Sequence, residues 1–167
     1  RPPEMLPYDQ VLQWKRQCEA HISKRGLMFH DMGHGWTAEP FGLDSSEGWS
    51  AREGVLTPEQ TEAVAELNGE RKLYKGVALN TNLCMSNPAA REGFVNTIVD
   101  YIEKNPHIHK VGCGVADTSH NHCECPECSK MRPADWYMMI MNELDEELTR
   151  RNLDTRIVFL SYLDTMF

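Results

Sequence analysis

The chain has 167 residues, of which 41% are hydrophobic and 25% are charged. This composition suits a folded domain with a buried core and excludes a disordered tail. The 25 acidic residues outnumber the 17 basic ones, giving a formal net charge of -8. That balance argues against a nucleic-acid-binding protein or one that binds anionic membranes. No apolar run approaches the roughly 20 residues of a membrane span, so we expect no membrane insertion.

The first predicted elements are a helix, a short strand and a long loop. Residues 6–25 read as a helix because apolar residues recur at three- and four-residue steps on one face, which comprises Val11, Trp14, Cys18 and Ile22. Residues 27–30 form a short apolar run that predicts a buried strand. A polar, glycine-containing stretch continues to about Glu53, and ordered loops of this length tend to be functional.

The second helix has a clear start. Thr57 is the predicted cap, Pro58 occupies the first helical position, and Gln60 completes a capping box. We expect this helix to end at Asn68 and Gly69. The segments 73–79 and 82–85 are weaker strand candidates.

The remainder of the chain alternates stronger helices and strands. A helix is predicted from Pro88 to about Asn105, a strand over 110–116, and a second helix from Pro133 to Asn152. Residues 156–163 form a continuous apolar run, the pattern expected of a strand covered on both faces. Strands that alternate with helices predict an α/β fold whose parallel sheet has right-handed crossovers.

Polar and titratable residues follow each predicted strand. In parallel α/β folds such strand ends meet at one rim, where chemistry collects. Carboxylates, histidines and aromatic rings together suit carbohydrate chemistry, and glycoside hydrolysis needs two carboxyl groups. Asp117 and Asp164 are the candidate catalytic pair, with Glu39 a weaker third. Each aspartate can equally be a turn or cap residue.

The predicted saccharide-binding residues on this rim are His34, Trp36, Asn87 and Tyr162. Trp36 and Trp49 lie in the long loop, where an indole ring is costly unless it packs or binds something. Either they contact a ligand, or they fold down as a lid over the core. A histidine such as His34 can also be a structural residue held by hydrogen bonds.

A cysteine cluster is the most specific local signal. Cys123, Cys125 and Cys128 lie within six residues and could bind Zn²⁺, with His120 or His122 as the fourth ligand. His34 offers a second route to that ligand. A closed site would be structural and an open one catalytic. The alternative is a reduced turn, or one disulfide with a spare thiol. The scattered cysteines, Cys18, Cys84 and Cys113, are interpreted as small buried hydrophobic residues.

Several segments resemble a bacterial domain family of uncharacterised function. They are residues 117–128 with the Cys-x-Cys-x-x-Cys loop, 133–137, 142–144, 157–164, the stretch 83–88 and the loop 33–36. The resemblance implies a grouping with (β/α)₈-barrel glycoside hydrolases, near the α-glucuronidases and β-N-acetylhexosaminidases. It also implies a larger, often secreted or surface-attached, polysaccharide-degrading protein. Thr118 departs from the Asp-Glu pair of the hexosaminidases, which argues against their mechanism.

The length can be compared with that expected barrel. A (β/α)₈ barrel needs about 250 residues and eight strands, whereas this chain offers about four strands. We therefore expect residues 1–167 to form a single domain that is about half of a larger barrel. Open sheet edges favour association, so we expect the domain either to pair with itself as a homo-oligomer or to expose apolar surface. The predicted function is acid/base glycoside hydrolysis in the intact protein. The alternative is a glycan-binding or zinc-stabilised scaffold without catalysis.

Overall fold

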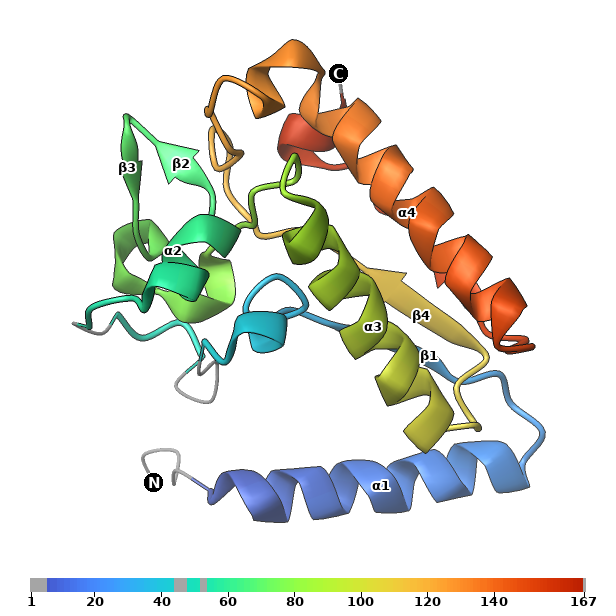
Figure 1. Cartoon of the computed structure of the whole chain (residues 1–167). Helices are drawn as coiled ribbons and strands as arrows, with labels where there is room; N and C mark the ends of the chain where they lie inside the picture. The colour runs from blue at the N-terminus through green and yellow to red at the C-terminus, as the bar shows by residue number, and fades with distance from the viewer. Residues whose placement is uncertain (1–5, 44–47, 52–53, 167) are drawn as a thin grey trace.

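The computed structural model describes residues 6–43, 48–51 and 54–166. The chain folds as a mixed α/β domain with a three-stranded parallel sheet, as Figure 1 shows in part. The sheet order is β1-β4-β5, formed by His30–Gly33, Lys110–Cys113 and Arg156–Val158. Asp31 pairs with Val111, and Val111 pairs with Ile157. The α/β class and the parallel sheet are therefore confirmed, and the described strands do not close into a barrel.

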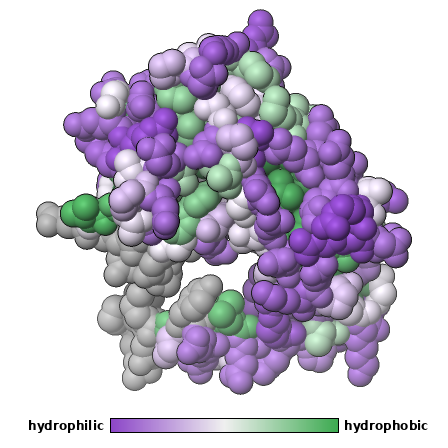
Figure 2. All heavy atoms as spheres, viewed as in Figure 1, coloured by the Kyte–Doolittle hydropathy of each residue, from purple (hydrophilic) through white to green (hydrophobic). Residues whose placement is uncertain are grey.

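Two helices pack against each other beside the sheet. They are α3 (Pro88–Lys104) and α4 (Pro133–Arg150), both predicted from the sequence. Their buried faces meet residues of β4 in the main core, whose largest fully buried members include Phe94, Ile98, Ile102, Val111, Tyr137, Ile140 and Leu144. Their outer faces carry mostly hydrophilic residues in Figure 2. This one-sided burial is the pattern of amphipathic helices that cover a sheet.

Helix α1 (Tyr8–Lys24) has the predicted location but not the predicted contacts. Val11 and Trp14 on the expected apolar face are 43% and 47% exposed, and Cys18 is exposed. Among the described side chains of this helix, only Glu19 is buried, and it binds Arg16 and His107 at 2.7 and 3.1 Å. The prediction of an apolar interface, and of Cys18 as a buried residue, is wrong because α1 packs through ion pairs.

The segment between α1 and α3 also differs from expectation. Helix α2 (Pro58–Ala63) begins with the predicted capping box but ends well before Asn68. The residues that follow form a hairpin of β2 (Glu66–Leu67) and β3 (Glu70–Arg71), and Asn68 takes a positive φ of 52° at its turn. The predicted strands at 73–79 and 82–85 are absent from the sheet. These residues form two 3₁₀ turns and a single bridge between Val64 and Leu83.

The ends of the sheet were predicted less accurately than its centre. The first strand begins at His30, three residues later than expected, because Leu27 and Met28 are exposed. The last strand stops at Val158, and Phe159 and Leu160 are 39% and 47% exposed. Burial of that strand on both faces was therefore wrong. The polypeptide then turns through a 3₁₀ segment, Leu163–Met166, back towards the carboxyl ends of the strands.

Candidate functional site

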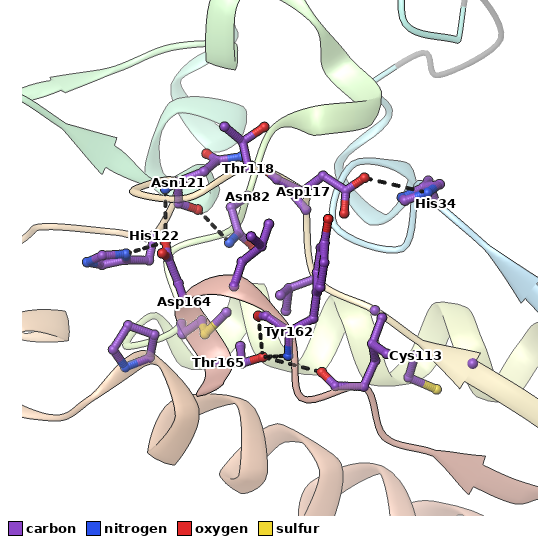
Figure 3. A pocket seen from close by; sticks show the side chains of 18 of the residues that line it. His34, Asn82, Cys113, Asp117, Thr118, Asn121, His122, Tyr162, Asp164 and Thr165 are labelled. Atoms are coloured by element: carbon purple, nitrogen blue, oxygen red, sulfur yellow. Dashed lines mark hydrogen bonds and ion pairs between the residues drawn. The ribbon is translucent and has the colours of Figure 1, made fainter. Parts of the chain in front are cut away.

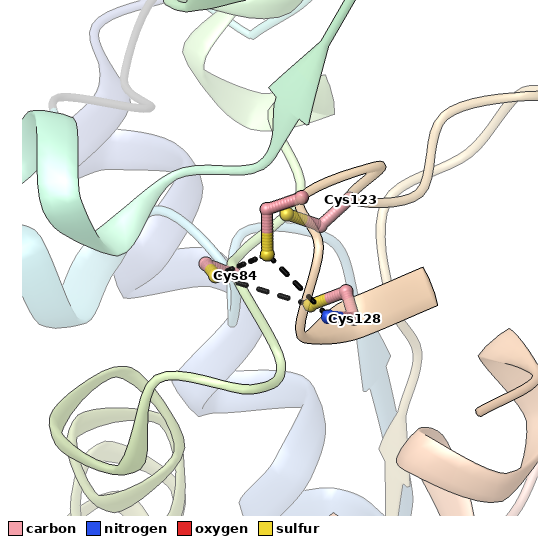
Figure 4. Close-up of side chains that lie close together, drawn as sticks. Cys84, Cys123 and Cys128 are labelled. Atoms are coloured by element: carbon pink, nitrogen blue, oxygen red, sulfur yellow. Dashed lines mark hydrogen bonds between the residues drawn. The ribbon is translucent and has the colours of Figure 1, made fainter. Parts of the chain in front are cut away.

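Four cysteine side chains meet beside the carboxyl edge of the sheet (Figure 4). Cys84 comes from the segment before α3, whereas Cys123, Cys125 and Cys128 come from the loop after β4. All four are buried, and their sulfur atoms lie within 4.8 Å of one another. The Sγ atom of Cys84 is 3.8 Å from that of Cys125 and 3.9 Å from that of Cys128. Four buried cysteines this close together could hold a metal ion.

The sulfur spacing fits tetrahedral coordination. A Zn–S bond of about 2.3 Å gives a tetrahedron whose edges are about 3.8 Å long. The distances of 3.8 and 3.9 Å from the Cys84 sulfur agree with that edge. A disulfide would bring two sulfur atoms to about 2.05 Å, and all six cysteines of this chain are free thiols. Tetrahedral sets of four sulfur ligands are typical of zinc and of iron–sulfur centres.

The surrounding backbone already supplies hydrogen bonds to these sulfur atoms. The N–H groups of Glu66, Ser86 and Cys128 donate to Cys123, Cys128 and Cys125 at 3.2, 3.3 and 3.4 Å respectively. Such donors stabilise a thiolate more than a thiol, because the negative charge strengthens the bond. The donor pattern therefore suits sulfur atoms that carry negative charge, as metal ligands do.

Neighbouring side chains also favour the thiolate form of Cys84. Hydrogen bonds from Cys123 and Cys128 hold the pKa of the Cys84 thiol well below its usual value, and Ser86 and Arg71 lower it further. The Arg71 side chain is anchored by a bond to the carbonyl oxygen of Val64 at 2.6 Å. A guanidinium group next to four thiols offsets part of the charge that a four-thiolate centre would carry.

The sequence located three of these four cysteines and missed Cys84. Cys84 is buried as expected, but it contacts other thiols instead of filling apolar space. The two histidines considered as fourth ligands lie outside the group of four. His122 Nδ1 is 2.7 Å from an oxygen of Asp164, and His120 is exposed. Cys113 is buried in the core as predicted, and burial raises the pKa of its thiol to about 12.

A cleft of about 240 Å³ adjoins the cysteine group (Figure 3). It lies at the carboxyl ends of β1, β4 and β5, where the sequence predicted a shared rim, and residues from all three strands line it. His34, Asp117, Tyr162 and Asp164 are among its lining residues, so four of the predicted catalytic and saccharide-binding residues come together there. The cleft contacts the cysteine group through Met85, which follows Cys84, and His122, which precedes Cys123.

Asp164 is tightly held on one side of the cleft. Its carboxylate accepts hydrogen bonds from the backbone N–H groups of His120 and Asn121, both at 3.0 Å, and contacts His122 at 2.7 Å. Burial alone would raise the pKa of Asp164, but these hydrogen bonds outweigh it and lower the pKa below its ordinary value. Asp164 is therefore ionised near neutral pH and fixes the loop that leads into Cys123.

Asp117 lies on the other side of the cleft and makes fewer contacts than Asp164. Its carboxylate is 3.8 Å from His34 Nε2, and about a third of its side chain remains exposed. Figure 3 shows Asp117 and His34 pointing towards one another, with Tyr162 between this pair and the pair of Asp164 and His122. The His34 ring also contacts Trp49 edge-on, with 5.1 Å between ring centroids. An accessible carboxylate beside an imidazole can exchange protons with a ligand.

Two predicted binding residues do not line the cleft. Trp36 is buried, and its indole N–H donates to the carbonyl oxygen of Gly112 at 3.0 Å. Asn87 caps α3 by accepting from the N–H groups of Ala89 and Ala90. Glu39, the weaker carboxylate candidate, lies in a 3₁₀ turn away from the lining residues.

Two asparagines that the sequence did not single out lie at the cleft. Asn121 donates its side-chain amide to the carbonyl oxygens of Asn80 and Asp117 at 2.9 and 2.7 Å. Asn82 donates to the carbonyl oxygen of Asn121 at 2.8 Å. These bonds join the segment that carries Cys84 to the loop that carries Cys123. Nothing in the local sequence marks either residue, because their partners are distant along the chain.

Comparison with known proteins gives one match. A family model described as a domain of unknown function (DUF4838) covers residues 10–166. No curated protein and no solved structure matches the chain significantly. Among the described helices, none is long and apolar enough to cross a membrane.

Proposed function

The chain belongs to the DUF4838 family of domains of unknown function, and we propose that it is a carbohydrate-active domain that binds a saccharide in the cleft described above. The observation that carries the proposal is the cleft at the carboxyl ends of three parallel strands, with the accessible carboxylate of Asp117 beside His34. Ligand sites of parallel α/β folds lie at this edge. Tyr162 and the apolar lining offer a surface for the C–H face of a sugar ring. The carboxylate of Asp117 can accept hydrogen bonds from the hydroxyl groups of the sugar.

The proposed reaction is acid/base hydrolysis of a glycosidic bond. Asp117 serves as the residue that transfers the proton, since its carboxyl group is accessible to a bound substrate and lies beside His34. Asp164 serves as the ionised partner, because its hydrogen bonds keep its pKa low. Glycosidases divide the two roles in this way, with one carboxyl group transferring the proton and the other remaining ionised. This chemistry agrees with the grouping with (β/α)₈-barrel glycoside hydrolases that the sequence resemblance implies.

One observation favours glycan binding without catalysis as a second candidate. Asp164 already accepts two backbone hydrogen bonds and contacts His122, which leaves little of its carboxylate free for a substrate. In that case Asp164 positions the loop between β4 and Cys123, and Asp117 binds a sugar hydroxyl. The domain would then be a glycan-binding module.

We assign zinc to the four cysteines in either case. The sulfur spacing matches Zn–S bonds of about 2.3 Å, and four thiolates complete a closed site with no position for substrate. The zinc ion would therefore be structural. Its role would be to tie the segment of Cys84 to the loop of Cys123, both of which reach the cleft.

The half-barrel architecture belongs to the same proposal. Among the described strands, β1 and β5 form the outer edges of the sheet, to which further parallel strands can be added. Exposed apolar residues follow β5, namely Phe159, Leu160 and Tyr162. Open edges favour pairing with other strands, so we propose that this sheet is extended within a larger barrel or by a second copy of the chain.

A glycan panel tests the main proposal. The protein and the variant Asp117→Asn are incubated with oligosaccharides of cellulose, xylan, mannan and chitin, and both binding and reducing-end release are measured. Asp145→Asn, which removes an exposed carboxylate on the outer face of α4, is the matched control. Hydrolysis that Asp117→Asn abolishes and Asp145→Asn preserves supports the enzyme. Binding without release supports the second candidate, and no binding to any glycan contradicts both.

A further inference from the structure

We infer that the cleft selects neutral or amino sugars and rejects uronic acids and other anionic saccharides. This inference rests on the proposed function and names the substrate class of the same cleft. It follows from the charges and hydrogen-bonding groups of the lining residues.

The fixed charges at the cleft have one sign. Asp117 and Asp164 line it, whereas no lysine or arginine occurs among the described residues that do. Sites that recognise carboxylate groups commonly use arginine, because its planar guanidinium pairs with both oxygens. A sugar carboxylate in this cleft would instead meet two like charges with no fixed cation beside them.

Several amide donors at the cleft are already committed. The N–H groups of His120 and Asn121 donate to Asp164. The side-chain amide of Asn121 donates to two carbonyl oxygens, and that of Asn82 donates to a third. A carboxylate ligand accepts hydrogen bonds only, so the N–H groups that make these bonds are not available to it.

The accessible charged group at the cleft is an acceptor, although the hydroxyl of Tyr162 and the ring of His34 also line the cleft and can donate. The carboxylate of Asp117 is accessible and accepts hydrogen bonds. The side-chain oxygen of Asn121 is buried at the cleft and has no partner among the described residues. Its orientation is fixed, because the nitrogen of the same amide is held by two carbonyl oxygens. Acceptors favour ligands that donate, such as the hydroxyl groups of a neutral sugar or the ammonium group of an amino sugar.

Matched methyl glycosides test this selectivity. Methyl glucoside and methyl glucuronide differ only in whether C6 carries a hydroxyl or a carboxylate, and the galactose and mannose series give equivalent pairs. Binding is measured by ligand-observed NMR titration at low salt, with methyl glucosaminide as the cationic probe. We expect each neutral glycoside that binds to do so at least about tenfold more tightly than its uronide. Added salt should narrow the difference, because it screens charge repulsion.

The variant Asp117→Asn removes the negative charge of this side chain but keeps its shape. Removing this charge should raise uronide affinity relative to the neutral glycoside, whereas Asp145→Asn should leave the ratio unchanged. Uronides that bind as tightly as the neutral sugars, or more tightly, would overturn the inference and leave saccharide binding intact. If neither member of any pair binds, the proposed function itself fails, and the inference fails with it.

Discussion

The sulfur atoms of Cys84 and Cys125 lie 3.8 Å apart, although a helix, a strand and two loops separate these residues along the chain. Their contact joins the segment before α3 to the loop after β4. It also changes the ligand set from three cysteines and a histidine to four cysteines. The cleft lies directly beside this junction, so the stability of the junction bears on the cleft.

Cys84→Ser should abolish stoichiometric zinc binding, because a serine hydroxyl is a poor zinc ligand and the remaining three thiols leave the site open. His120→Ala is the matched control, since the sequence proposed His120 as a ligand and the structure leaves it exposed. Elemental analysis of protein purified without added metal measures the zinc content of both variants. Zinc retained by Cys84→Ser but lost from His120→Ala would restore the histidine-containing site.

Removal of the metal should destabilise the domain, and acid should have the same effect as a chelator. The ligands are thiolates, so protons compete with the metal and its affinity falls as the pH falls. We expect the melting temperature to fall on treatment with EDTA and to recover when zinc is added back. Unchanged melting curves with and without stoichiometric metal would contradict a structural role.

Asp164→Asn should destabilise the loop around His120 by about 1–2 kcal/mol, because charged acceptors make the stronger hydrogen bonds. The folded-state pKa of Asp164 is depressed, so its stabilising effect is fully present above the unfolded pKa. That effect is lost as the pH falls below about 4 and through the folded pKa. Urea unfolding at pH 7 and pH 3 checks this prediction. The difference between wild type and variant should shrink at the lower pH.

Glu19→Ala should weaken the docking of α1 far more than Val11→Ala does. Glu19 is 2% exposed and its removal leaves Arg16 and His107 without their shared partner, a loss of about 1–2 kcal/mol because both partners are partly exposed to solvent. Val11 is 43% exposed, so its truncation should cost little. Chemical denaturation of the two variants measures the contrast. A larger effect at Val11 would mean that α1 packs through the apolar face after all.

Local signals in the sequence determined the helices. The capping box at Thr57, the prolines at the starts of α3 and α4 and the apolar spacing within them act over a few residues, and each of these helix starts is confirmed. The sequence also placed His34, Asp117, Tyr162 and Asp164 at the ends of strands, and the cleft brings them together. These four residues lie close together because neighbouring parallel strands end at the same edge of the sheet.

Only the tertiary structure decided the fourth cysteine of the cluster, the buried face of α1 and the irregular course of residues 73–85. Cys84 lies in an apolar stretch that local patterning reads as core or strand, and its role depends on a loop folded against it from far along the chain. Glu19 is buried where α1 meets His107, which lies far along the chain and contacts one of its carboxylate oxygens. Local sequence encodes secondary structure through nearest neighbours, whereas ligand sets and ion-pair partners depend on contacts that form only when distant segments pack together.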